Sequence, residues 1–282
     1  MAAKNHVVVV TGASRGLGRG MARGFGSKGA TVYVTGRSAR GALANTAEEV
    51  TAAGGKGIAV QCDHADDVRV AALFERIAAE SGKLDILVNN AAAVYGEELV
   101  APGPFWQKPL RLAEMMDVGM RSNYVAAYYA APIMAKAKKG LIANISFYGA
   151  VSYFHGPAYG AAKAGNDKMA FDMSKDLLPY RVAAVSIWPG FIRTEAIAAI
   201  PDNQVPEFLK PLWPLFENPE FTALVLEALY RDPQLMLHTG KALIGAELGI
   251  KYGIRDINGK QPVSFRDTKG APITYFEVAN PF

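Results

Sequence analysis

Tyr159 and Lys163 lie four residues apart in a stretch, AYGAAKAGND (158–167), that otherwise holds mainly alanine and glycine. On a helix, this spacing puts the phenol and the ammonium on one face, with Cβ atoms about 5–6 Å apart. An ammonium about 5 Å away, at an effective dielectric near 20, stabilises a phenolate by roughly 3 kcal/mol, or about two pK units. The pair therefore predicts a tyrosine acid/base whose pKa is lowered by Lys163. The alternative is an ordinary amphipathic helix with an interfacial tyrosine and a surface lysine.

The elements that must position this pair follow a regular order. Continuous apolar runs, rich in β-branched residues and followed by turn residues, predict strands that are buried on both faces. Alanine-rich stretches of helical length (17–28 and 40–53) separate the first three runs. This alternation predicts an α/β fold with a doubly wound, parallel, seven-stranded sheet in a single domain over residues 1–282. The predicted strands are residues 6–12, 30–37, 56–63, 83–91, 139–146, 180–190 and 240–247.

A glycine-rich turn, TGASRGLG (11–18), joins the first predicted strand to the first helix. Glycines there allow a tight turn and close approach of the backbone to a pyrophosphate, and the helix N-terminus offers free N–H groups. Because many tight turns contain glycines, the position of the motif carries the prediction of a dinucleotide site. The residues expected to contact the cofactor in this turn are Gly12, Ser14, Arg15, Gly16, Leu17 and Gly18.

The end of the second predicted strand indicates which dinucleotide binds. Residues 31–40, TVYVTGRSAR, contain no acid that could receive the ribose 2′-hydroxyl of NAD, and the strand ends at Arg37. Arginine accommodates the 2′-phosphate of NADP, and Arg15 offers a second guanidinium. We therefore expect NADP(H) rather than NAD(H). The alternative for Arg37 is an exposed surface arginine without a ligand.

Composition excludes several other classes. The chain has 282 residues, of which 50% are hydrophobic and 20% are charged, a balance typical of globular proteins. Its net charge is +4 and its sequence contains no long basic run, so nucleic acid is not expected as a partner. Cys62 is the single cysteine, and the histidines are scattered, so neither a disulfide nor a metal site is expected. The start, MAAKNHVVVVTG, has too short an apolar run for a signal peptide or membrane span, which predicts a cytoplasmic protein.

Three further segments complete a family pattern: CD (62–63), NNAA (89–92) and PGFIRT (189–194). Together with TGASRGLG and YGAAK, they resemble the short-chain dehydrogenase/reductase family over nearly the whole chain. The resemblance implies that Asp63 holds the adenine edge and that the turn with Asn90 lies under the cofactor. It also implies that the last segment places backbone atoms and a threonine against the nicotinamide carboxamide, through Pro189, Gly190, Ile192 and Thr194.

The resemblance implies a mechanism that agrees with the Tyr159–Lys163 spacing. Tyr159 would protonate a carbonyl oxygen, or take a proton from an alcohol, while Lys163 lowers its pKa and hydrogen-bonds the cofactor ribose. The nicotinamide C4 would carry the hydride. The expected protein is an NADP(H)-dependent oxidoreductase for the carbonyl or alcohol of a fairly apolar small molecule, and a homo-oligomer (dimer or tetramer).

The sequence departs from the family pattern at two places. Counting thirteen residues back from Tyr159 gives Ser146 as the serine that hydrogen-bonds the substrate oxygen, whereas counting along the NIS strand motif gives Phe147. We prefer Ser146, with Ser152 or a site without a hydroxyl as alternatives. Gly119 in DVGMRSN stands where many relatives have an asparagine; it could still distort the helix but offers no amide. Asn123 is either a partial substitute or a simple helix cap.

Two long connections interrupt the alternation of strands and helices, at 94–113 and 191–222, and are expected to form substrate loops. A C-terminal extension covers 250–282. Alternative functions are a dinucleotide sensor or scaffold without turnover, and a double-bond reductase or epimerase on the same fold. The aromatic residues expected to line an apolar substrate pocket are Tyr95, Phe105, Trp106, Tyr148, Tyr153, Phe154, His155, Trp213 and Phe216.

Overall fold

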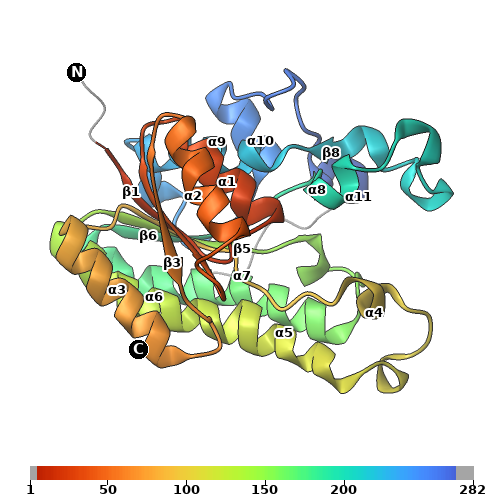
Figure 1. Ribbon diagram of the computed structural model, residues 1–282, viewed down its shortest axis with the longest axis horizontal. Coiled ribbons are helices and arrows are strands. Elements are labelled where there is room, and N and C mark those ends of the chain that lie inside the picture. Colours follow the sequence, from red (N-terminus) through yellow and green to blue (C-terminus); the bar gives the residue numbers. More distant parts are fainter. Residues whose placement is uncertain (1–4, 271–282) are drawn as a thin grey trace.

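A single parallel sheet of seven strands forms the centre of the molecule (Figure 1). The computed structural model describes residues 5–270. The strand order is β3-β2-β1-β4-β5-β6-β9, so the sheet is doubly wound, as predicted, and each observed strand lies within a predicted run. The strands are β1 (Val7–Val10), β2 (Thr31–Gly36), β3 (Lys56–Gln61), β4 (Ile86–Asn89), β5 (Gly140–Ile145), β6 (Val182–Trp188) and β9 (Ala242–Ile244).

Helices cover both faces of this sheet (Figure 1). One face carries α1 (Gly16–Gly26), α2 (Ala42–Ala52), α9 (Pro219–Arg231) and α10 (Gly245–Tyr252). The opposite face carries α3 (Asp67–Ser81), α6 (Ser122–Ala137) and α7 (Pro157–Leu177). Short 3-10 turns η4 (Tyr148–Ala150), η5 (Leu178–Tyr180) and η9 (Leu235–Leu237) lie in the connections.

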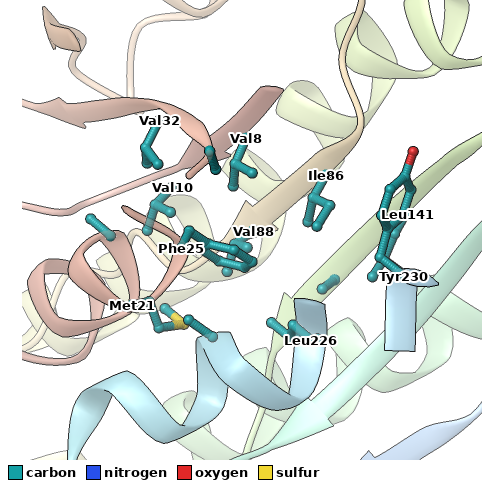
Figure 2. Packing of buried hydrophobic residues seen from close by; sticks show 14 of the residues in the cluster. Val8, Val10, Met21, Phe25, Val32, Ile86, Val88, Leu141, Leu226 and Tyr230 are labelled. Atoms are coloured by element: carbon teal, nitrogen blue, oxygen red, sulfur yellow. The ribbon is translucent and has the colours of Figure 1, made fainter. Parts of the chain in front are cut away.

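The continuous valine run of β1 follows from this layering, because both faces of its strand are covered. Val8 and Val10 point into the core beneath α1 and α9, where Figure 2 shows them beside Met21, Phe25 and Leu226. Val7 and Val9 point into the second core, on the side of α3 and α6. All four valines are buried.

Each of the two long connections holds short elements rather than a continuous helix. The first contains α4 (Gly96–Val100), η1 (Phe105–Gln107) and η2 (Leu110–Ala113), and leads into α5 (Glu114–Met116) and the π-type turn η3 (Asp117–Arg121). The second contains β7 (Phe191–Ile192) paired with β8 (Phe216–Glu217), together with α8 (Glu195–Ala198), η6 (Asp202–Gln204), η7 (Glu207–Leu209) and η8 (Trp213–Leu215). It is shorter than expected, because α9 begins at Pro219.

Part of the predicted C-terminal extension packs against the second connection. The short helix α11 (Phe265–Lys269) buries Phe265, whose ring lies 5.7 Å from that of Phe191 between centroids. Residues 271–282 of the predicted extension lie outside the described residues. Between residues 5 and 270, no helix is long and apolar enough to cross a membrane.

Candidate active site

A cavity of about 560 Å³ lies where β4, β5 and β6 end, near the N-terminal turn of α1. Ligands bind at the carboxyl ends of the strands in doubly wound sheets, because the loops there come from both sides of the sheet. The winding of the sheet reverses between β1 and β4. From β1 the chain continues to β2 and β3 on one side, and from β4 it continues to β5 and β6 on the other. The cavity brings together the predicted residues Leu17, Asn90, Ser146, Tyr159, Lys163, Pro189, Gly190, Ile192 and Thr194.

Tyr159 and Lys163 lie on α7, which begins with Pro157 at its first position. A proline is favourable there, because the N–H that it lacks has no partner within the helix. The Lys163 Nζ lies 5.5 Å from the Tyr159 ring centroid and donates a hydrogen bond to the carbonyl oxygen of Ile145, at 3.1 Å. The predicted pairing of the two side chains on one helical face is confirmed.

The pKa values of the pair differ from the expectation. Burial raises the pKa of Tyr159 above its ordinary value and lowers the pKa of Lys163 to about 8. The predicted lowering of the Tyr159 pKa by Lys163 is therefore wrong for the polypeptide, since desolvation of the phenol outweighs the attraction of an ammonium that is itself desolvated. Tyr159 is held in its neutral form, which can donate a proton.

Ser146 lies at the end of β5 with its side chain buried in the cavity wall. Its Oγ donates a hydrogen bond of 3.0 Å to the carbonyl oxygen of Lys163. The Phe147 ring packs among aromatic rings, 5.1 Å from Phe154 between centroids. The Ser152 hydroxyl donates to the carbonyl of Tyr148, and Ser152 lines a different hollow on the outer side of α7. Of the candidates, Ser146 is the one whose hydroxyl shares the cavity with Tyr159.

The glycine turn has the geometry that a pyrophosphate requires. Gly12 and Gly16 have φ of 65° and 60°, in the left-handed region that favours glycine. A Cβ atom on Gly18 would lie 2.4 Å from the carbonyl oxygen of Gly12, so only glycine lets α1 pack this closely on the turn. The Asn90 amide donates to the carbonyl oxygens of Thr11 and Gly12, which ties the NNAA turn to the glycine turn. The residues present therefore fit a dinucleotide.

A carboxylate lies at the N-terminus of α1. The Gly16 N–H donates to Glu195 Oε2 at 2.8 Å, and Arg19 forms a 3.5 Å ion pair with the same carboxylate. Helix α1 has no acid in its first turn and no capping side chain from Arg15, so its free N–H groups and positive dipole end attract an anion. The Glu195 carboxylate thus occupies a position suited to a phosphate group. Its contact with Gly16 was not predicted from the sequence.

The remaining predicted cofactor residues lie around the ends of β1 to β3. Arg15 and Arg37 are exposed, and neither guanidinium forms an ion pair with another residue in the 5–270 range. Ser14 lies beside Gly36, the last residue of β2. Asp63 follows β3 and accepts a hydrogen bond from the Ala65 N–H at 3.1 Å. No acid stands at the end of β2, as the sequence indicated.

Gly119 forms a bend that several asparagines hold in place. Its φ is 138°, and its carbonyl oxygen accepts hydrogen bonds from Asn123 Nδ2 at 2.9 Å and Asn166 Nδ2 at 2.6 Å. The same Asn123 amide also donates to Asn166 Oδ1, and Asn144 Nδ2 donates to the Asn166 carbonyl. Asn123 is thus not a simple helix cap, since its side chain donates to a carbonyl instead of accepting from an N–H.

Sequence reasoning missed Asn166, whose only signal was a polar residue among small ones on α7. The aromatic prediction was too broad: from that set, only Phe154, His155 and Phe216 line the cavity. Phe105, Trp106 and Tyr153 instead line the hollow on the outer side of α7, and their side chains are exposed.

Comparisons of the sequence with known proteins identify a family and related proteins. The family model described as short chain dehydrogenase matches residues 6–205. Dehydrogenase/reductase SDR family member 1 of Mus musculus is 37% identical over 266 residues, covering 91% of this chain and 85% of that protein. A 3-oxoacyl-[acyl-carrier-protein] reductase of Pseudomonas aeruginosa is 32% identical over 205 residues, covering 72% of this chain and 81% of that protein.

Two solved structures extend the comparison. A metagenomic short-chain oxidoreductase in complex with NADP is 34% identical, with a TM-score of 0.59, and the match covers 65% of this chain and 81% of that one. A short-chain alcohol dehydrogenase structure from Sinorhizobium meliloti has a TM-score of 0.73 at 24% identity, covering 86% of this chain and 95% of that one. The second likeness concerns the fold alone.

Proposed function

The chain belongs to the short-chain dehydrogenase/reductase family, and on that premise we propose that it transfers a hydride between NADP(H) and the carbonyl or alcohol of an apolar small molecule. One observation carries the proposal: Tyr159, Lys163 and Ser146 share one cavity with the segments expected to hold a nicotinamide. Most other side chains of this cavity are apolar, which suits a substrate without charge.

The proposed roles follow from the contacts of each residue. Tyr159, neutral because it is buried, donates its proton to the carbonyl oxygen during reduction. Ser146 binds the same oxygen when its single O–H turns from the Lys163 carbonyl, to which it donates without substrate, toward the cavity. Lys163, whose Nζ is anchored on Ile145, binds the ribose and supplies positive charge beside the phenol. NADPH, when bound, supplies the hydride.

Arg15 and Arg37 support NADP(H) over NAD(H). Both residues are exposed: Arg37 directly follows β2, and Arg15 follows Ser14, which contacts Gly36 at the end of that strand, where no acid stands to receive a 2′-hydroxyl. One structural neighbour has been solved with NADP. The proposed cofactor set is that of the sequence analysis: Gly12, Ser14, Arg15, Gly16, Leu17, Gly18, Arg37, Asp63, Asn90, Tyr159, Lys163, Pro189, Gly190, Ile192 and Thr194.

The two long connections contribute to the proposed substrate site. Leu99 from the first connection and Phe216 from the second line the cavity, which supports their assignment as substrate loops. A homo-oligomer and a cytoplasmic location remain predictions. Tyr124 and Tyr128, exposed together on α6, are consistent with an interface between copies, and size-exclusion chromatography with light scattering tests it.

NADPH oxidation with a panel of apolar ketones tests the proposal directly. We expect turnover with at least one ketone, and NADPH affinity at least tenfold above NADH affinity, or about 1.4 kcal/mol. Arg37→Asp should abolish this preference, while Arg40→Asp, three residues further along the same exposed segment, is the matched control. Tight NADPH binding without turnover of any ketone would favour the sensor or scaffold alternative.

A further inference from the structure

His155 forms part of the wall of the active-site cavity, directly beside Tyr159. The two ring centroids are 5.2 Å apart and the ring planes are nearly perpendicular, at 86°. On its other side, the imidazole contacts Phe154, with centroids 4.0 Å apart. His155 is half-buried, so its ring is held between two aromatic neighbours while it borders the cavity.

The imidazole of His155 is free to bind a ligand. Of the other polar side chains in the wall, Asn90 bonds the glycine turn, Ser146 and Lys163 bond backbone carbonyls, and Tyr159 is reserved for the reacting oxygen. No hydrogen bond to the His155 ring occurs within residues 5–270. The imidazole therefore keeps its full hydrogen-bonding capacity for a ligand that enters the cavity.

The backbone of His155 is held in an unusual conformation. Its φ is 62°, in the left-handed region, and only two other non-glycine residues among those described, Lys138 and Arg181, share this feature. Left-handed backbone costs a side-chain residue roughly 1 kcal/mol or more, and such residues cluster at ligand sites. Gly156 follows with φ 86° just before α7 begins, so the chain places a histidine where a second glycine would be easier.

The surroundings of the His155 ring favour its neutral form. Burial and the nearby ammonium of Lys108 both lower the pKa of the imidazole below its ordinary value. Lys108 is fixed in the first substrate loop by a hydrogen bond from its Nζ to the carbonyl of Leu99, at 3.1 Å. A neutral imidazole has one N–H donor and one acceptor nitrogen, so it can bind either a carbonyl or a hydroxyl oxygen.

From these observations we infer that His155 binds a second, uncharged oxygen of the substrate, in addition to the oxygen that reacts at Tyr159. The inference rests on the proposed function and specifies its substrate class: apolar ketones with a further carbonyl or hydroxyl group. Because the two rings are neighbours in the same wall, with centroids 5.2 Å apart, we take the second oxygen to lie on a carbon two or three bonds from the reacting one.

The experiment compares two ketones with the same six-carbon skeleton. One is a hexanone, and the other is a hexanedione whose second carbonyl group lies two or three bonds from the first. The measured quantity is the ratio of kcat/KM for the diketone to kcat/KM for the monoketone, so intrinsic reactivity cancels between variants. We expect this ratio to fall roughly tenfold in His155→Gly, which removes the ring and relieves the backbone, and in His155→Phe, which keeps a ring. His155→Asn tolerates left-handed backbone and keeps a donor and an acceptor, so it should retain most of the ratio.

Tyr153→Phe is the matched control, because Tyr153 is a neighbouring polar ring that points away from the cavity. An unchanged ratio in both His155→Gly and His155→Phe, or an equal fall in Tyr153→Phe, would overturn the inference. A second readout is the ratio of the equilibrium affinities of the two ketones for the NADP⁺ complex, measured by protein fluorescence. If no ketone were turned over, the proposed function would fail, and the binding ratio would still decide the role of His155.

Discussion

At the scale of single residues, the central finding is that burial dominates the chemistry of Tyr159. The sequence correctly predicted that Tyr159 and Lys163 share one helical face. It did not predict the direction of the pKa shift of the phenol, because sequence spacing carries no information on desolvation. Burial raises the pKa of Tyr159 and lowers that of Lys163 to about 8. Tyr159 is therefore a neutral acid, and it lies beside a Lys163 ammonium that loses its proton more easily than an exposed lysine.

Tyr159→Phe should abolish turnover while NADPH affinity stays nearly unchanged, because the substitution removes only the hydroxyl that exchanges the proton. Lys163→Ala should lose both turnover and affinity, since Lys163 is also proposed to hold the ribose. Steady-state kinetics and fluorescence titration with NADPH measure the two effects. Tyr148→Phe is the control, because the Tyr148 hydroxyl bonds the carbonyl of Lys269 outside the cavity. Activity retained in Tyr159→Phe would contradict the mechanism.

Ser146→Ala should lower kcat roughly a hundredfold or more, the effect of removing one donor to a developing oxyanion, about 2.7–4 kcal/mol. Ser152→Ala is the matched control and should change little, since its hydroxyl bonds a backbone carbonyl away from the cavity. Phe147→Ser should reduce stability rather than raise activity, because the ring packs against Phe154 and Phe191. A nearly silent Ser146→Ala would show that Tyr159 works without this partner.

At the scale of elements, the sequence predicted the sheet well, because a strand buried on both faces is a continuous apolar run. All seven strands were located from apolar runs, including the partly exposed edge strands β3 and β9, and the loops that follow β4, β5 and β6 supply much of the cavity wall. The hydrogen bond from the Asn166 side chain on α7 to the Gly119 carbonyl in the η3 turn could not be predicted, since the two residues lie 47 positions apart. The contact of Glu195 with Gly16 spans 179 residues and is equally invisible in a linear pattern.

Glu195→Gln should strengthen NADPH binding about two- to fivefold. The Glu195 carboxylate lies at the N-terminus of α1, where the pyrophosphate is expected, and removing one charge at a helix end changes the free energy by about 0.3–1 kcal/mol. Fluorescence titration at low ionic strength measures the affinity, since salt screens this effect. Glu48→Gln, an exposed site on α2, controls for net charge. Weaker binding in Glu195→Gln would mean that the carboxylate supports the cofactor instead of competing with it.

At the scale of the whole molecule, the segment from Gly190 to Glu217 links the sheet to the C-terminal part of the chain. The Arg193 N–H donates to the carbonyl oxygen of Glu217, at 2.8 Å, within the small β7–β8 sheet. The Glu217 side chain is buried beside Gly190, and within residues 5–270 its carboxyl oxygens form no hydrogen bond of good geometry, the Gly190 N–H being only a weak donor to them. Asp256 from the C-terminal part lies close enough to disfavour a second negative charge, and it is fixed by the N–H of Asn218.

This arrangement makes stability depend on pH. Burial raises the pKa of Glu217 to about 8 from an ordinary value of 4.5, against a smaller opposing effect of the Gly190 N–H and with Asp256 as a lesser contributing cause. Below pH 4.5 the carboxyl is protonated in both the folded and the unfolded chain, so the contribution of the neutral group to stability is complete. Between that value and about pH 8 the unfolded chain releases the proton while the folded chain keeps it, so the contribution is lost as the pH rises.

Glu217→Gln should therefore gain stability relative to the wild type as the pH rises from about 5 to about 8, because glutamine stays neutral. The expected gain in the free energy of unfolding across this window is at least about 1.4 kcal/mol, the equivalent of one pK unit. Urea denaturation at several pH values measures it. Glu207→Gln, at an exposed carboxylate paired with Lys210, should show no such trend. Parallel pH profiles for the wild type and Glu217→Gln would mean that Glu217 is ionised in the folded protein, with a positive charge or water compensating it.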